Sequence, residues 1–572
     1  MFDCIVGGGQ LIDGTGASPR RADIGINDGR IAVIGDLSGE QAGTFIDATG
    51  LVVAPGVIDI HTHYDAQLFW DGYATPSPLH GVTTVIGGNC GFSLAPLAPE
   101  NAEYLTRMLA RVEGMPLETL ESAVPWNWST FADYLGALEG NVGVNAGFMV
   151  GHTALRRHVM GKDSHREATA AEVEQMAELL HESIEAGGLG FSSSVSVTHN
   201  DADGHPVPSR FASREEFMRL CEVTGQHEGT QLEIVPSPGL FDDETIDLFA
   251  SMSATANRPL NWNLLGINSR IRPEVENKLG ASDAAAARGG RVVALTIPML
   301  PSLRVNFVSG FVLDSLPGWA PLFELPLEER LAKLADPEYR RQLESSAATT
   351  DSGGLRLLQK WDRLVILQTF DPANDGLIGR SIGEIAAERG HSNAFDALIE
   401  IVCTDSLRTV FATVATGDDD DSWKLRRQIW DDPRALIGGS DSGAHLDMID
   451  TFSMASYVLG PLARDRQLMP LETAVKFLTG APADLYGVVD RGRVVEGAWA
   501  DLMVFDPATI GPEPVHMVHD LPADAPRLYA AARGVEHVLV NGVEIVRHGE
   551  LTGARPGHVL RSGRDTRTVT AR

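Results

Sequence analysis

Two histidines separated by one residue are the clearest sign of chemistry in this chain. His61 and His63 follow the apolar run 57–60, which comes directly after Pro55-Gly56. Side chains alternate across a β-strand, so both imidazoles point the same way from the end of a buried strand. Two imidazoles that leave one strand end side by side form half of a metal site. The competing interpretation, two solvated loop histidines, fits the apolar run and the Pro-Gly turn less well.

An aspartate far downstream completes the predicted metal site. Asp441 follows the apolar run 435–439, the last of eight predicted strands. The first and eighth strands of a closed barrel are neighbours, so Asp441 is expected beside His61 and His63. Two imidazoles and a carboxylate suit zinc and leave a position for water. Asp441 is therefore the predicted general acid/base, which takes a proton from water and later gives it to a leaving amine.

Polar residues also end other predicted strands, where barrel active sites lie. They are Asn89 and Cys90, His152, Ser192 to Ser194, Glu233, Asn261 and Asn263. Cys90 is either a thiolate ligand or a buried, inert thiol. Glu233 alternates with apolar neighbours and is predicted to face the barrel centre. Because a bare buried carboxylate is costly, Glu233 is either a metal ligand or part of a buried salt bridge or hydrogen-bonded support.

Four residues are candidates for contact with a substrate. His152 either hydrogen-bonds the substrate or is structural. Arg156, four residues further on, either holds a substrate carboxylate in a bidentate fork or forms a surface ion pair. Asn263 is predicted to line the site, since amide oxygens bind zinc poorly beside imidazole and thiolate. His445 either lines the site or orients Asp441.

The elements that position these residues alternate between strand and helix. Residues 172–185 and 213–226 have the apolar spacing of amphipathic helices. The second begins with the pattern of a capping box, Ser213 and Glu216. Eight apolar strands that mostly alternate with helices predict an α/β fold, a closed parallel (β/α)8 barrel.

The chain divides into a barrel, an insertion and strand-rich ends. The barrel is predicted over residues 56–490. Within it, residues from about 300 to 430 are too long for one loop and predict an insertion after the seventh strand that forms a lid. Residues 1–55 and 491–572 contain short strands and turns, so both termini are expected to build one small β domain.

The composition restricts the classes of partner. Lys and Arg total 46 against 77 Asp and Glu, a net charge of −31, which argues against nucleic acid and anionic membranes as partners. No apolar run approaches the ~18 residues of a membrane span. The four cysteines lack paired spacing, and the N-terminus lacks a signal-peptide pattern. We therefore expect a cytoplasmic enzyme without a disulfide framework.

Several segments together resemble a known family. They are P-G-V-I-D-I-H-T-H-Y-D (55–65), G-N-C-G-F-S-L-A-P (88–96), P-W-N-W (125–128), G-H-T-A-L-R (151–156), G-S-D (439–441) and G-A-W-A-D-L-M-V-F-D (497–506). These segments resemble the amidohydrolase superfamily, most closely its N-acyl-D-amino-acid deacylase branch. The resemblance implies a metal-dependent barrel with a β-sandwich made from both termini, and one or two zinc ions held by His61, His63, Cys90 and Asp441. It also implies hydrolysis of the amide bond of a small N-acyl amino acid.

The chain departs from this branch on the fifth and sixth strands. The deacylases carry a metal-binding histidine on each, whereas this chain reads Q-L-E-I-V-P (231–236) and L-N-W-N-L (260–264). Glu233 is the candidate replacement for one of these ligands. A mononuclear hydrolase of a cyclic amide, lactone, carbamate or C–C bond is the alternative. A barrel that only binds a ligand is a third hypothesis, and a homo-oligomer is compatible with the sequence.

Overall fold

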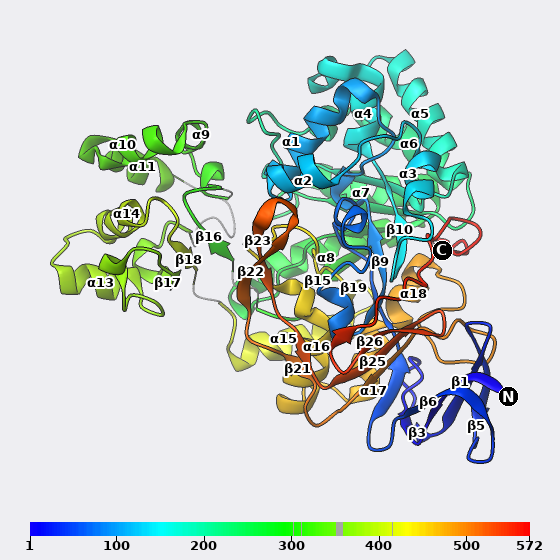
Figure 1. Cartoon of the computed structure of the whole chain (residues 1–572). Helices are drawn as coiled ribbons and strands as arrows, with labels where there is room; N and C mark the ends of the chain where they lie inside the picture. The colour runs from blue at the N-terminus through cyan, green and yellow to red at the C-terminus, as the bar shows by residue number, and fades with distance from the viewer. Residues whose placement is uncertain (301–302, 311, 350–357, 414–415, 572) are drawn as a thin grey trace.

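The computed structural model describes residues 1–300, 303–310, 312–349, 358–413 and 416–571 (Figure 1). Its centre is a set of parallel strands. They are β8 (Val57–Asp59), β9 (Val82–Gly87), β10 (Asn145–Phe148), β11 (Val150–Gly151), β12 (Gly190–Ser194), β13 (Gln231–Val235), β14 (Pro259–Trp262), β15 (Arg291–Thr296) and β19 (Ala435–Ile437). They pair in the orders β8-β9-β10 and β11-β12-β13-β14-β15-β19.

Backbone hydrogen bonds connect these two groups of strands at both edges. Only Met149 separates β10 from β11, and its N–H donates to the Gly87 carbonyl over 2.9 Å. At the other edge, the His63 N–H donates to the Ser442 carbonyl over 2.7 Å, and the Asp441 N–H donates to the His61 carbonyl over 3.1 Å. The end of β8 therefore lies beside the end of β19, as the predicted metal site requires.

Helices follow most of these strands and form the outer layer. They are α1 (Ala102–Val112), α2 (Leu117–Ala123), α3 (Phe131–Leu138), α4 (His152–Met160), α5 (Ala170–Glu185), α6 (Arg214–Gly225), α7 (Asp243–Ala256), α8 (Arg272–Ala287), α15 (Asp420–Trp430), α16 (Met454–Tyr457), α17 (Leu471–Leu478) and α18 (Gly480–Tyr486). The predicted helices over 172–185 and 213–226 correspond to α5 and α6. Helices α17 and α18 are separate elements that meet at Thr479.

The predicted capping box of α6 forms only in part. Ser213 accepts the Glu216 N–H over 3.3 Å, as an N-cap should. The carboxylate of Glu216 does not return to the N-cap, because it pairs with His152 and Arg156 in the interior. This correction matters for the predicted substrate contacts.

Both termini contribute to one sheet beside the parallel strands. Its order is β27 (Glu550–Leu551), β26 (Val543–Arg547), β25 (Val535–Val540), β20 (Leu502–Phe505), β7 (Val52–Pro55), β2 (Gln10–Leu11) and β3 (Arg20–Arg21). A second sheet has the order β5 (Arg30–Gly35), β4 (Asp23–Asn27), β1 (Phe2–Gly7) and β6 (Ala42–Asp47). Residues of both sheets, among them Val6, Ile24, Val53 and Leu502, share one hydrophobic cluster. Two short hairpins also lie in the C-terminal part, β21 (Gly511–Pro512) with β24 (Ala532–Arg533) and β22 (His516–Leu521) with β23 (Ala525–Tyr529).

An insertion separates β15 from β19, and we use this word for residues 303–413. It contains β16 (Arg304–Val305), β17 (Val365–Gln368), β18 (Val410–Ala412), α9 (Ala320–Phe323), α10 (Leu327–Ala335), α11 (Pro337–Ala347), α13 (Ile382–Arg389) and α14 (Ala394–Thr404). Figure 1 shows it as a separate green lobe. It has a hydrophobic cluster of its own around Trp319, Trp361 and Phe395. Helices α13 and α14 are separate because Gly390 adopts φ 75° and ends α13.

Two further observations concern the whole described chain. Among the residues that the structure describes, no helix has both the length and the hydrophobicity of a membrane span. All four cysteines are free thiols.

Candidate metal centre and active site

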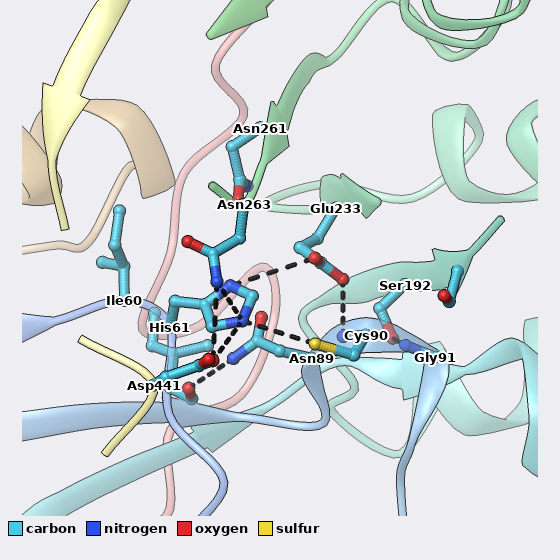
Figure 2. Close-up of polar contacts among 12 residues, drawn as sticks. Ile60, His61, Asn89, Cys90, Gly91, Ser192, Glu233, Asn261, Asn263 and Asp441 are labelled. Atoms are coloured by element: carbon cyan, nitrogen blue, oxygen red, sulfur yellow. Dashed lines mark hydrogen bonds and ion pairs between the residues drawn. The ribbon is translucent and has the colours of Figure 1, made fainter. Parts of the chain in front are cut away.

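Four predicted site residues converge at the ends of three parallel strands. His61 and His63 follow β8, Cys90 lies in the short 3-10 helix η3 (Asn89–Gly91) after β9, and Asp441 follows β19. One ligand atom from each lies within 4.8 Å of the others. Figure 2 shows His61, Cys90 and Asp441 pointing toward one another. The structure thus brings together residues up to 380 positions apart, from 61 to 441.

The distances within this cluster match those between ligands of a tetrahedral zinc ion. Asp441 Oδ1 lies 3.2 Å from His61 Nε2 and 3.2 Å from His63 Nε2. Cys90 Sγ lies 3.4 Å from His61 Nε2 and 3.6 Å from His63 Nε2. Two nitrogen ligands about 2.05 Å from zinc in tetrahedral geometry are about 3.3 Å apart, and a thiolate stands slightly further away. These four distances therefore suit ligands of one small cation.

Unusual backbone conformations aim two of these side chains. Cys90 has φ 58° and Asp441 has φ 58°, in the left-handed region that non-glycine residues rarely adopt. Cys90 is preceded and followed closely by Gly88 and Gly91, whose φ values are 70° and 77°. A Cβ on Gly88 would lie 2.2 Å from the Met149 carbonyl oxygen, so only glycine fits there. Strain of this kind, about 1–3 kcal/mol per residue, is typical of functional sites.

The charges of the cluster favour a bound cation. Burial raises the pKa of the Cys90 thiol well above its usual value, and nearby carboxylates such as Glu233 raise it further. Burial likewise raises the pKa of the Glu113 carboxyl to about 7 and holds that of Glu233 well above normal. Burial opposes ionisation of Asp441, but hydrogen bonds from both imidazoles outweigh it and keep its pKa well below the ordinary range. A divalent cation among these groups would offset several buried negative charges.

Glu113 is a site residue that the sequence analysis did not identify. Its Oε1 lies 3.4 Å from Nδ1 of His63, and both side chains are only 3% exposed. Burial lowers the pKa of His63, but Glu113 and then Asp441 outweigh that effect and raise it to about 9. Glu113 follows helix α1 rather than a strand, so a search of strand ends could not find it. The only available signal was a lone acid before Gly114.

Glu233 lies next to Cys90 and faces the Nδ1 atom of His61 (Figure 2). Its Oε2 accepts the Cys90 N–H over 2.8 Å, and its Oε1 lies 3.9 Å from His61 Nδ1. Asn263 lies nearer the cluster, with Nδ2 3.3 Å from His61 Nε2 and 3.4 Å from Asp441 Oδ1. Asn261 points elsewhere and donates to the Leu232 carbonyl over 3.0 Å.

Comparison with known proteins agrees with this arrangement. The amidohydrolase family model matches residues 44–546. This chain belongs to the amidohydrolase family. It is 33% identical over 569 residues to the D-aminoacylase of Alcaligenes xylosoxydans xylosoxydans, covering 98% of this chain and 97% of that protein. It is 28% identical to the N-acyl-D-glutamate deacylase of the same organism, over 98% of this chain and 96% of that protein. The resemblance to the N-acyl-D-amino-acid deacylases is therefore confirmed.

Solved structures of the amidohydrolase family give the same result. A crystal structure of D-aminoacylase is 30% identical, has a TM-score of 0.64 and covers 98% of this chain and 100% of that chain. Another structure describes a binuclear metal centre in D-aminoacylase. The N-acyl-D-glutamate deacylase of Bordetella bronchiseptica, complexed with zinc and a phosphonate inhibitor, has a TM-score of 0.65 and 26% identity, with 98% of this chain and 100% of that chain covered.

His152 and Arg156 do not join the cluster. His152 Nε2 lies 2.7 Å from Glu216 Oε1, and its Nδ1 lies 2.8 Å from Ser193 Oγ. Arg156 donates to both Glu216 oxygens, over 2.6 and 2.5 Å, and to the Ser164 carbonyl over 3.2 Å. None of the three charged or titratable side chains is exposed. These contacts occupy the Arg156 guanidinium within the protein, so a substrate carboxylate needs a different partner.

Two other histidines lie close to Asp441. His445 has φ 48°, its N–H donates to the Glu113 carbonyl, and burial lowers its pKa to about 4. His199 hydrogen-bonds Ser194 Oγ over 2.7 Å, and its ring centroid lies 5.2 Å from that of Phe92. Burial and then the neighbouring His445 lower the His199 pKa to about 3. Both imidazoles are therefore neutral near pH 7.

Proposed function

We propose that this amidohydrolase hydrolyses the amide bond of N-acyl amino acids, of the D series, with a bound zinc ion. The observation that carries the proposal is the convergence of His61, His63, Cys90 and Asp441 on one point. The similarity to D-aminoacylase and to the deacylases of N-acyl-D-glutamate and N-acyl-D-aspartate over nearly the full chain supports the substrate class.

We further infer that the parallel strands form a closed (β/α)8 barrel over residues 56–490, and that 1–55 and 491–572 form a β-sandwich. The hydrogen bonds at both edges of the parallel strands support closure. The hydrophobic cluster shared by the two terminal sheets supports the sandwich. The insertion, predicted as about 300–430, is proposed to be a lid beside the site, since Arg111 of α1 pairs with Asp314 of the insertion.

Four residues would hold the zinc ion. They are His61 and His63 through Nε2, Cys90 through Sγ and Asp441 through Oδ1, in agreement with their spacing. When bound, zinc supplies a Lewis acid that makes water acidic enough to lose a proton near neutral pH. The alternative, a second ion with Glu233 as a ligand, would give two ions per chain in the metal content of the purified protein.

Asp441 is positioned to move the proton of the reaction. Its side chain is 25% exposed, whereas those of His61 and His63 are 0% and 3% exposed, so Asp441 is the most accessible acid/base of the three. Its pKa lies well below the ordinary range, so the carboxylate is ionised and can accept a proton from water as the oxygen attacks the amide carbon. The same proton then passes to the amide nitrogen as the C–N bond breaks. The products are the free carboxylic acid and the amino acid.

The amide of Asn263 is proposed to position Asp441 and to line the substrate site. Its Nδ2 lies 3.4 Å from Asp441 Oδ1, and its Oδ1 is buried and has no partner among the described residues. His445 is proposed to line the same side of Asp441.

A substrate panel tests the proposed function directly. The full-length protein would be purified without chelator and its zinc content measured. Release of free amine would be followed for N-acetyl-D- and N-acetyl-L-amino acids, and ring opening to a carboxylic acid would be followed for a hydantoin and a lactone. We expect zinc in the protein and turnover of N-acyl-D-amino acids. Stoichiometric zinc with turnover only of the cyclic substrates would replace this proposal with the alternative hydrolase. A protein that binds neither zinc nor another divalent metal would reject both.

A further inference from the structure

Each imidazole of the cluster has a buried carboxylate near its Nδ1 atom, the ring nitrogen that does not face Asp441 and Cys90. Glu113 Oε1 lies 3.4 Å from His63 Nδ1, and Glu233 Oε1 lies 3.9 Å from His61 Nδ1. The Nε2 atoms of the same rings face Asp441 and Cys90. An imidazole that binds a cation through Nε2 must carry its proton on Nδ1, so each carboxylate stands where that N–H needs an acceptor.

The contact between Glu233 and His61 lies entirely in the interior. Glu233 and His61 are fully buried, and neither Glu233 Oε1 nor His61 Nδ1 has another hydrogen-bond partner among the described residues. Unpartnered buried polar atoms are costly, and these two lie opposite each other at slightly more than hydrogen-bond distance. A small rotation of either side chain would satisfy both.

Glu233 acts on two ligands at once. Its second oxygen, Oε2, accepts the backbone N–H of Cys90 over 2.8 Å. Cys90 has a left-handed backbone conformation, which is strained and needs external support. Glu233 therefore supports both the ring of His61 and the backbone that aims the Cys90 thiol.

We propose that Glu113 and Glu233 are positioning residues that fix His63 and His61 in the metal-binding tautomer, and that Glu233 is not itself a ligand. The inference rests on the zinc site of the proposed function. It assigns a role to Glu113, which belongs to no strand end. It also explains how Glu233, on the fifth strand, can hold His61 in place through Nδ1 without binding the ion.

The test is the zinc dissociation constant of Glu113→Gln and Glu233→Gln, measured in the full chain by competition with a chromophoric chelator. Outer carboxylates of this kind typically change metal affinity by about 10–100-fold, so each variant should weaken zinc binding by that factor. Glu118→Gln is the matched control, since Glu118 is exposed on helix α2 and should leave the constant unchanged.

Two further measurements separate positioning from a structural role and from direct ligation. Neutralising a buried carboxylate should leave the melting temperature of the metal-free variants equal to or above that of the unsubstituted protein. A purely structural residue would lower that temperature and leave zinc binding unchanged, which would overturn the proposal. Cobalt-substituted Glu233→Gln should show the visible spectrum of the unsubstituted protein at saturation, and a changed spectrum would identify Glu233 as a ligand and overturn its assignment.

The outcome does not depend on catalysis. If Glu233→Gln does not fold, the zinc affinity of Glu113→Gln alone tests whether an outer carboxylate supports the ligand imidazole. A zinc affinity within about twofold of the control would overturn the proposal. Weakened zinc binding in the variants of a protein that hydrolyses no amide would reject the proposed function and retain this inference.

Discussion

Replacing Asp441 with asparagine should remove catalysis while keeping the shape of the site. The substitution exchanges one carboxylate oxygen for an amide nitrogen and removes the negative charge that both imidazoles contact at 3.2 Å. Because the Asp441 carboxylate is ionised far below its ordinary pKa, it is a base throughout the neutral range, and asparagine cannot replace it. A positioned general acid/base contributes about 10²–10⁴-fold in rate, or about 3–5 kcal/mol.

The assay must separate proton transfer from metal binding, since Asp441 is also a proposed ligand. Turnover of an N-acyl-D-amino acid is measured across a zinc titration, so that kcat is compared with the site saturated. Asp441→Asn should lose at least about 100-fold in kcat at saturation. Asp420→Asn, on the exposed first turn of α15, is the control and should retain full activity. A saturated Asp441→Asn enzyme with kcat within about fivefold of the control would refute the assigned role.

Three other predictions concern protons and packing. Zinc binding must displace protons from His63, whose pKa is about 9, and from the Cys90 thiol. In a chelator competition, zinc affinity should therefore rise at least about tenfold per pH unit from about pH 6.5 to 8.5. A zinc affinity that does not change with pH would contradict these protonation states. Glu216→Ala leaves Arg156 charged and buried without its partner. Urea unfolding should show a loss of about 3–5 kcal/mol in the free energy of unfolding, with zinc affinity unchanged. A loss below about 1 kcal/mol would contradict the buried pair. Trp319→Ala removes a fully buried side chain from the core of the insertion, which should lower its free energy of unfolding by about 3–5 kcal/mol. Amide hydrogen exchange should become faster in the insertion but not in the parallel strands. Faster exchange in both would show that the two unfold together.

The strands and the metal cluster could be predicted because both depend on local patterns and one geometric rule. Apolar runs between turns locate strands such as β9, β13 and β25, and the carboxyl ends of parallel strands meet on one side. The rule brought His61, His63, Cys90 and Asp441 together although the chain between them is hundreds of residues long. It needed no knowledge of the packing of any helix.

The parts that failed depend on which way a side chain turns. The spacing of Ser213 and Glu216 predicts a helix start correctly, yet it does not reveal that the carboxylate faces inward to His152 and Arg156. Without that partner, Arg156 has the pattern of a substrate-binding residue. Glu113 was missed for the converse reason, since it reaches the site from a loop after a helix. The sequence alone does not indicate which side chains tertiary packing brings into contact.

The charge of the site bears on how many ions it holds. One zinc ion with the Cys90 thiolate and the Asp441 carboxylate is electrically neutral when both histidines are neutral, so a single ion balances its own ligands. A second divalent ion would add two positive charges where the fifth and sixth strands supply one carboxylate, Glu233, and one neutral amide, Asn263. Glu233 in turn is committed to the Cys90 N–H and faces His61 Nδ1. We therefore infer that Glu233 and Asn263 support a single ion rather than hold a second one.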